Sequence, residues 1–309
     1  MKIYNHIDEF SSQKPVVLTT GTFDGVHLGH QNILNRIIEL AQQIDGESVV
    51  LTFSPHPRHV LNPNSDIKLI QSLDEKLDAF RALNIDHVIV HPFTKAFAEL
   101  SSDAFIRTIL TKKLRVSKLV IGYDHHFGKN RTGSFEHLVE HGTLYGFDVE
   151  EIPARDVDEV KVSSTKIRRA LAEGNMEKAK QYLSRCFELE GKVVHGQKLG
   201  RTLGFPTANL QLSDPHKLIP KPGVYAVDLD LEGRTHKGML NIGTKPTVVS
   251  KSTDNQLSIE VHIIDFDKEL YGKSLVLRFK KRIREEIKFD SLTQLKRQLE
   301  EDLILSKIL

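Results

Sequence analysis

Two histidines, His27 and His30, stand where an apolar run gives way to a helical pattern. The run at 16–20 is apolar or β-branched throughout, which is typical of a buried strand. The apolar residues that follow His30 have the spacing of one helix face. The first turn of a helix has unpaired N–H groups and a partial positive charge, and imidazoles can donate hydrogen bonds, so this junction suits a phosphate group. Taken alone, the two histidines are equally consistent with ordinary surface residues that cap a helix.

Two further candidate residues follow other predicted strands in the first half of the chain. His56 stands between two prolines after a run at 48–53, and Asp124 follows a run at 119–121. The carboxyl ends of parallel strands share one edge of a sheet, so we expect both side chains to face the same crevice as His27. A stiff turn at His56 is the plainer alternative.

A third piece is the start of a later helix. Ser164 and Thr165 precede a helical pattern that carries Arg168 one turn inside. Hydroxyls and a guanidinium at a helix N-terminus can grip a triphosphate. A simple cap is the alternative reading of the two hydroxyls.

The second half offers oxygen ligands and one carboxylate. Thr207 and Asn209 alternate on an extended segment, so their side chains share a face, and their neutral oxygens suit Mg²⁺. Glu260 lies in a run where it alternates with Ile259 and Val261, and it is either a general base or an outward residue of a half-buried strand. Glycine-rich turns near a basic residue can wrap a phosphate, although they are also common barrel turns. The residues concerned are Gly196, Gly200, Arg201 and Gly204.

Composition excludes several classes of protein. The chain has 309 residues, 39% of them hydrophobic and 27% charged, as in a globular protein with room for two cores. No apolar run approaches the roughly 18 residues that span a bilayer, and the N-terminus lacks the apolar core of a secretion signal. With one cysteine no intrachain disulfide can form, which favours the cytoplasm, and a net charge of +2 gives no support for a nucleic-acid partner.

The order of predicted elements indicates two domains. Up to residue 152, apolar runs alternate with amphipathic helical segments, which predicts an α/β domain with a parallel sheet covered on both faces. From residue 187, β-branched runs are separated by turn residues, which predicts a small antiparallel sheet or barrel. A closing helix is expected at 292–305, with one apolar stripe formed by Leu292, Leu295, Leu299, Leu303 and Ile304. We place the domains at 1–185 and 186–309.

Both halves resemble one enzyme family. The stretch from Gly21 to His30 resembles the HxGH signature of nucleotidyltransferases, in the form seen in bacterial FAD synthetases. The stretch from Gly200 to Asn209 resembles the GRxxGxPTAN signature of riboflavin kinases, and the match continues through Glu260 to Phe289. The resemblance implies a Rossmann-like FMN adenylyltransferase domain followed by a riboflavin kinase barrel.

The resemblance also implies roles for the first set of residues. His27 and His30 would hold the triphosphate of ATP and stabilise the departing pyrophosphate, and His56 and Asp124 would help place FMN. Other residues would contribute to nucleotide binding: Gly21, Thr22, Phe23, Asp24, Ser164, Thr165 and Arg168. Where the family often has an aromatic residue, this chain has His125, which affects the local flavin contacts.

In the second half, Glu260 would be the general base of the kinase, and Thr207 and Asn209 would hold Mg²⁺. The glycine-rich turns at 196–204 would bind nucleotide, and Arg284 and Phe289 would contact the flavin. ATP would be a co-substrate at both sites, with FMN and FAD as products rather than prosthetic groups. The expected partners are therefore small molecules (riboflavin, FMN and ATP), with neither nucleic acid nor membrane, and the oligomeric state stays open.

Two alternatives remain at this stage. The first is a monofunctional riboflavin kinase whose N-terminal domain binds nucleotide without catalysis, which the departure at His125 motivates. The second is a non-catalytic flavin-binding regulator that has kept the fold. The presence of Glu260 and of both HxGH histidines argues against the regulator, because a protein that only binds has no need of a general base.

Overall fold

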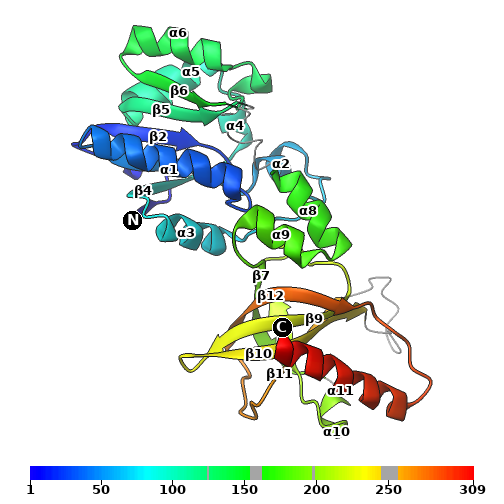
Figure 1. Cartoon of the computed structure of the whole chain (residues 1–309). Coiled ribbons are helices and arrows are strands. Elements are labelled where there is room, and N and C mark those ends of the chain that lie inside the picture. Colours follow the sequence, from blue (N-terminus) through cyan, green and yellow to red (C-terminus); the bar gives the residue numbers. More distant parts are fainter. Residues whose placement is uncertain (124, 154–161, 197–198, 245–256) are drawn as a thin grey trace. The chain divides into compact units, whose positions relative to one another are not determined.

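The computed structural model describes residues 1–123, 125–153, 162–196, 199–244 and 257–309. The chain forms two compact units, Met1–Ser164 and Thr165–Leu309, which are described separately (Figure 1). The division comes before the predicted boundary at 185/186, because helices α8 (Ser164–Glu173) and α9 (Met176–Leu183) contact the second unit. For example, the Lys221 amide donates to the Leu171 carbonyl of α8 at 3.0 Å. A functional boundary at 185/186 stays a prediction.

The first unit is built on a six-stranded parallel sheet in the order β1-β4-β3-β2-β5-β6. Its strands are β1 (Lys2–Tyr4), β2 (Val16–Thr20), β3 (Glu47–Ser54), β4 (His87–Pro92), β5 (Val116–Gly122) and β6 (Asp148–Ile152). The chain adds strands on one side of β2 and then returns to the other side with β5. The predicted doubly covered parallel sheet is confirmed, and β1, only three residues long, is an addition that no apolar run announced.

Helices cover both faces of this sheet. On one face, α1 (Leu28–Gln43) and α3 (Leu73–Ala82) pack on alternate strand residues such as Val17 and Val50. On the other face, α6 (Phe135–Tyr145) and the π-helix η2 (Phe105–Lys113) pack on residues such as Leu18 and Leu51. Shorter elements join them: η1 (Ile7–Glu9), α2 (Pro57–Leu61), α4 (Lys95–Ala98), α5 (Ser102–Ala104) and η3 (Lys129–Arg131).

The second unit contains a closed antiparallel barrel in the order β10-β11-β8-β7-β12-β9. Its strands are β7 (Glu188–Val194), β8 (Ala208–Leu212), β9 (Gly223–Leu231), β10 (Arg234–Thr244), β11 (Leu257–Ile263) and β12 (Ser274–Arg284). Large buried side chains such as Tyr225 and Phe279 fill it. The predicted barrel is confirmed, and the short helix α10 (Leu199–Thr202) lies in the connection before β8.

The closing helix, α11 (Leu292–Ile308), packs on the barrel differently from its predicted apolar stripe. Leu299 and Leu303 do pack against the barrel, but Leu292 and Ile304 are 64% and 60% exposed. Asp302, by contrast, is completely buried. The expectation of a single apolar stripe from 292 to 304 was therefore wrong, because a carboxylate that is paired inside the protein takes one of the buried positions.

Candidate functional sites

The turn from β2 into α1 lies at the carboxyl edge of the parallel sheet, where the strand order reverses between β2 and β5. Ligands of doubly wound sheets bind at such a point. The turn contains two non-glycine residues with positive φ, Phe23 at 49° and Val26 at 37°. Gly25 has a φ of 96°, and an added Cβ would lie 3.2 Å from Ile70, so this position favours glycine. The strained turn is held in place by its neighbours, which is a common property of functional loops.

His27 and His30 are brought together at the start of α1. His27 is the N-cap residue, and its Nδ1 accepts a hydrogen bond from the His30 amide at 3.3 Å. The two imidazoles stack with centroids 3.6 Å apart and planes 17° from parallel. Because Nδ1 of His27 accepts, a neutral ring has its proton on Nε2, which makes Nε2 a donor of the kind that phosphate oxygens take. The paired histidines therefore combine two imidazoles with a helix N-terminus.

Asp24 connects the turn to two other segments. Its buried carboxylate accepts hydrogen bonds from the amides of Ile70 and Gln71 at 3.0 and 3.2 Å, and its carbonyl accepts one from the Ser164 hydroxyl at 2.8 Å. Ser164 thus contacts the 21–24 turn, and its predicted role in binding phosphate stays a prediction. The Asp24 carboxylate itself organises the backbone, and its role in nucleotide binding stays a prediction.

Lys76 is a residue of this site that sequence reasoning missed. It lies on α3, is only 8% exposed, and its Nζ donates to the Thr22 carbonyl at 3.2 Å and to the Thr52 hydroxyl at 3.0 Å. Burial lowers the pKa of Lys76 to about 8, against the opposing effect of Asp24. The sequence does contain one indication of this role. Lys76 lies among Leu73, Leu77 and Phe80, on the face of the helix that is otherwise apolar.

The structure describes most of the other residues predicted for the first site. His56 is the N-cap of α2 and accepts from the Arg58 amide at 3.1 Å, so it also forms the stiff turn expected as its alternative. Asp124 lies outside the described residues. The ring of the neighbouring His125 stacks near Phe127, with centroids 6.0 Å apart. Thr165 is exposed and Arg168 half-buried on α8, which belongs to the second unit.

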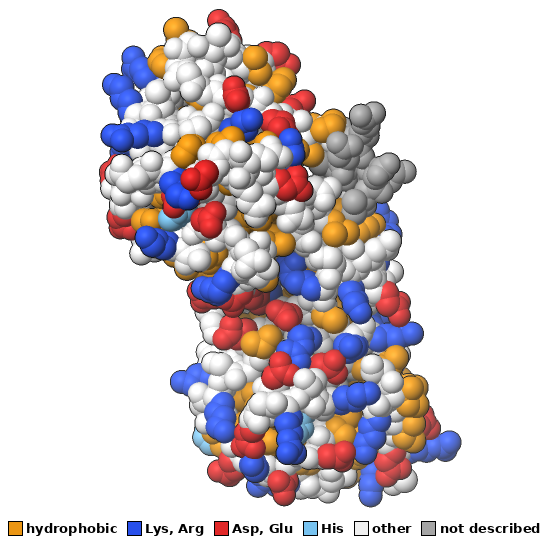
Figure 2. Space-filling model, turned by 60° about the vertical axis from the view of Figure 1, so that its left-hand side comes forward, with side chains coloured by type: hydrophobic (Ala, Val, Ile, Leu, Met, Phe, Trp, Pro, Cys, Tyr) orange, Lys and Arg blue, Asp and Glu red, His pale blue; other side chains and the backbone are white. Residues whose placement is uncertain are grey.

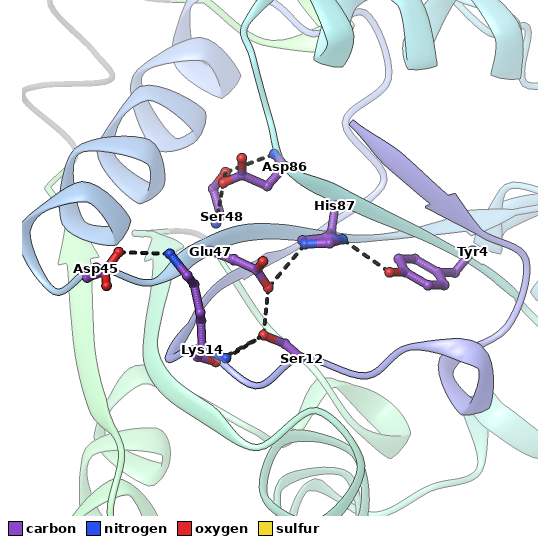
Figure 3. Close-up of polar contacts among 8 residues, drawn as sticks. All are labelled: Tyr4, Ser12, Lys14, Asp45, Glu47, Ser48, Asp86 and His87. Atoms are coloured by element: carbon purple, nitrogen blue, oxygen red, sulfur yellow. Dashed lines mark hydrogen bonds and ion pairs between the residues drawn. The ribbon is translucent and has the colours of Figure 1, made fainter.

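A different polar cluster lies at the opposite, amino edge of the same sheet (Figure 3). His87 contacts Glu47 at 3.2 Å and the Tyr4 hydroxyl at 3.2 Å, and the Ser12 hydroxyl donates to Glu47 at 2.6 Å. Hydrogen bonding from Ser12, assisted by His87, lowers the pKa of Glu47 against the opposing effect of burial. Because Ser12 contacts the carboxylate rather than the imidazole, this is no arrangement for activating a nucleophile, and we assign it to the fold.

In the second unit, the barrel brings Thr207, Asn209 and Glu260 together. Asn209 on β8 lies opposite Glu260 on β11 in the strand register, and the Thr207 hydroxyl donates to the Glu260 carboxylate at 3.3 Å. Glu260 and Asn209 occupy the face opposite to the buried Val261, as the predicted alternation required. A hydroxyl, an amide and a carboxylate oxygen at one corner fit a hard cation such as Mg²⁺.

A pocket lies beside this corner. Its lining includes Arg201, Thr207, Val261 and the segment 266–271, which sequence reasoning did not propose as part of the site. The glycines around it are tightly fitted: a Cβ on Gly196 would lie 2.1 Å from the Asn209 side chain, and one on Gly200 would lie 2.2 Å from the Phe205 carbonyl. Gly204 has a φ of 88° in the same connection. Gly196 and Gly200 thus lie against Asn209 and Thr207, and the role of this turn in nucleotide binding stays a prediction.

Arg284 and Phe289 also lie together, with the guanidinium carbon 5.8 Å from the ring centroid. Arg284 is held by the buried Asp302 of α11, through Nε at 2.9 Å and Nη2 at 2.7 Å. The flavin contacts predicted for this pair stay a prediction. The basic run at 280–284 is matched by acids, including the Lys280–Asp228 pair at 3.2 Å, and charges of both signs are interspersed on the face drawn in Figure 2.

Comparison with known proteins matches the two halves of the chain to two different enzyme families. Residues 9–166 match the family model of FAD synthetase, and residues 183–308 match that of riboflavin kinase. A bifunctional riboflavin kinase/FMN adenylyltransferase of Listeria monocytogenes is 40% identical over 93% of this chain and 90% of its own length. The enzyme of the same description from Escherichia coli K12 is 38% identical over 98% of this chain and 96% of its own length.

A solved structure is also similar over the whole chain. It is described as a macrolide-efflux protein from Streptococcus pneumoniae, and it covers 99% of this chain and 98% of its own with a TM-score of 0.89 and 29% identity. In the described part of this chain, no helix combines the length and the apolar character that crossing a bilayer requires.

The parallel sheet lies in the half that matches FAD synthetase, and the closed barrel lies in the half that matches riboflavin kinase. Together they define an enzyme that transfers phosphorus-containing groups. With family models matching both halves and relatives matching nearly the full length, the chain belongs to the FAD synthetase family, and its second half is a riboflavin kinase domain.

Proposed function

We propose that this protein makes FMN from riboflavin and then FAD from FMN, consuming ATP at each step. The observation that carries the proposal is the presence of both polar corners in one chain: the paired histidines at the carboxyl edge of the sheet, and the Thr207–Asn209–Glu260 corner of the barrel. FMN and FAD are then products, and the chain has no redox role.

In the first reaction, the barrel would transfer the γ-phosphoryl group of ATP. The 5′-hydroxyl of riboflavin attacks the γ-phosphorus, its proton passes to Glu260, and the bond to the β-phosphate oxygen breaks to release ADP. The Thr207 hydroxyl, which donates to Glu260, would hold the carboxylate in place. Mg²⁺ held by the oxygens of Thr207 and Asn209 would neutralise charge on the phosphates. Gly196, Gly200, Arg201 and Gly204 would surround the nucleotide.

In the second reaction, no protein nucleophile is needed. A phosphate oxygen of FMN attacks the α-phosphorus of ATP, the bond from that phosphorus to the bridging oxygen breaks, and pyrophosphate leaves. His27 and His30 would donate hydrogen bonds to the departing phosphates, so that catalysis consists of positioning and charge stabilisation. Ser164, Thr165 and Arg168 would bind the β- and γ-phosphates, which is why we take 1–185 as the functional domain.

A second candidate is a riboflavin kinase whose first unit binds nucleotide without catalysis. The observation behind it is His125, which occupies a position where an aromatic residue is usual and packs against Phe127.

The cytoplasmic location predicted from the single cysteine stays part of the proposal.

One incubation separates these candidates. Purified protein is mixed with riboflavin, ATP and Mg²⁺, and FMN and FAD are followed by chromatography. Both products are expected; FMN without FAD supports the kinase alone, and neither product would contradict the proposal.

Paired variants then assign the sites. His27→Ala should stop FAD formation from supplied FMN and leave riboflavin phosphorylation intact, whereas Glu260→Gln should slow phosphorylation by about 10²–10⁴-fold and spare FAD formation from FMN. If either folded variant lost both reactions, the assignment of two separate sites would be wrong.

A further inference from the structure

Asp103, His137 and His141 form a cluster away from both sites described above. His137 and His141 are one turn apart on α6, so their rings share a face of the helix, and Asp103 faces them from α5. The Nε2 atoms of His137 and His141 lie 2.8 and 3.3 Å from the same carboxylate oxygen, Oδ1 of Asp103. The three ligand atoms all lie within 4.8 Å of one another. Two imidazole nitrogens and one carboxylate oxygen therefore converge on one point.

The hydrogen bonding of His141 makes this convergence unusual. Its Nδ1 lies 3.0 Å from the His137 carbonyl, which can only accept, so Nδ1 bears a proton. In a neutral ring, Nε2 then presents a lone pair to the carboxylate, and two acceptors repel each other. The contact is favourable only if a second proton or a cation lies between them. A carbonyl behind the ring is also the usual partner that orients a metal-bound histidine.

The spacing of the donor atoms fits a transition metal. Ligands at 2.0–2.1 Å from a tetrahedral ion lie about 3.3 Å from one another. The Asp103–His141 separation of 3.3 Å has this value, and the Asp103–His137 separation of 2.8 Å would have to open by roughly 0.5 Å. The side chains of His137 and His141 are 26% and 19% exposed and that of Asp103 is 70% exposed, so solvent could complete the coordination.

We propose that Asp103, His137 and His141 bind one divalent transition-metal ion of the Zn²⁺ class. Imidazole nitrogen with a single carboxylate favours such ions over Mg²⁺ and Ca²⁺, which prefer oxygen ligands alone. The proposal is independent of the flavin chemistry proposed above.

The ion would connect two elements that support the loop after β5. The His137 ring contacts Phe127 of that loop at 6.4 Å between centroids, and Phe127 contacts Phe105, which follows α5, at 5.5 Å. The Lys129 amide donates to the Leu100 carbonyl, just before α5, at 2.7 Å. A metal bridge from α5 to α6 would therefore stabilise the base of the loop that carries His125.

The test is zinc binding to the full-length protein. Chelator-treated protein is dialysed against Zn²⁺ in excess Mg²⁺, and bound metal is quantified for wild type, Asp103→Ala, His141→Gln and the control His236→Gln. His236 is half-buried in the second unit and packs on Phe266, so it matches a ring of the cluster without being part of it. We expect one tight equivalent in wild type and in the control, and binding at least about 100-fold weaker in the two cluster variants.

Ring signals give a second readout. Of the 15 histidines, one equivalent of Zn²⁺ should shift the ¹⁵N imidazole resonances of two in wild type, and those two should be absent or unshifted in the cluster variants. Zinc should also raise the thermal transition of wild type and leave Asp103→Ala unchanged. If wild type takes up zinc no more tightly than the cluster variants, or if His236→Gln loses the same equivalent, a proton alone joins these side chains and the proposal is wrong.

Discussion

Lys76→Met tests whether a buried charge beside the paired-histidine site lowers stability at neutral pH. The pKa of Lys76 falls from 10.5 to about 8 because the ammonium group is buried, and the difference of 2.5 at 1.36 kcal/mol per pH unit is about 3 kcal/mol. Between these two pH values the unfolded chain binds a proton that the folded chain does not, so stability due to Lys76 rises with pH. Below pH 8 the folded protein holds the charge and bears the whole cost.

Methionine keeps most of the volume and removes the charge. It also removes two hydrogen bonds, to the Thr22 carbonyl and the Thr52 hydroxyl, which contribute about 1 kcal/mol each. At pH 7 the variant should therefore be about 1 kcal/mol more stable than wild type, and by pH 10.5 about 2 kcal/mol less stable.

Calorimetric unfolding of both proteins from pH 7 to 10.5 measures this crossover, since taking the difference cancels the other titrating groups. Lys95→Met, at an exposed lysine of the same unit, is the matched control for the substitution itself. If the difference in unfolding free energy between wild type and Lys76→Met stayed constant over this range, the reasoning about burial would be refuted.

Three further predictions concern other paired or strained positions. Asp302→Asn should destabilise the barrel by about 3–5 kcal/mol, because it leaves the Arg284 guanidinium without its buried counter-charge, and a melting curve measures this. Ser12→Ala should cost more stability at neutral pH than in acid, because a lowered carboxyl pKa stabilises the fold above its unfolded value and this contribution is lost as pH falls through the folded-state pKa; denaturant titrations from neutral into acid pH check it. Gly25→Ala, at φ 96°, should impair FAD formation from FMN and leave riboflavin phosphorylation unchanged in the chromatographic assay.

The parts of the fold that follow from local periodicity could be predicted from the sequence. The run at 16–20, the helix after His30 and the β-branched runs of the second half all appear as predicted strands and helices. The juxtaposition of His27 and His30 could also be predicted, because both lie within one turn of a helix start.

Features that depend on distant partners could not be predicted in this way. Asp302 is buried because Arg284, 18 residues away, supplies its counter-charge, and no local pattern encodes that pairing. The same holds for β1, whose three residues are a strand only because β4 has a free edge beside it. The division between compact units falls at the start of α8, because α9 contacts β12 of the barrel and the Lys221 amide donates to the Leu171 carbonyl of α8. A change of composition near 186 does not reveal these contacts.

The two edges of the parallel sheet surround their buried ionisable groups with different hydrogen-bond partners. At the amino edge, the Glu47 carboxylate contacts the His87 ring and accepts a hydrogen bond from Ser12, while the Tyr4 hydroxyl contacts the other nitrogen of His87 (Figure 3). At the carboxyl edge, the two acceptors of Lys76 are a carbonyl and a hydroxyl, both neutral. The nearby Asp24 carboxylate only partly offsets the cost of burying this ammonium group, and an anion bound at the turn at 21–24 would reduce that cost further.

Nucleotide binding should therefore change how stability depends on pH. If ATP binds at this turn, its phosphates favour the charged form of Lys76, so the pKa rises and the gain in stability above pH 8 shrinks. Calorimetry of Glu260→Gln with saturating ATP keeps phosphoryl transfer slow while the first unit is titrated. The difference in unfolding free energy between Glu260→Gln and the Lys76→Met/Glu260→Gln double variant should then depend less on pH between 8 and 10.5. An unchanged slope with ATP bound would mean that Lys76 supports only the turn and that the nucleotide phosphates lie elsewhere.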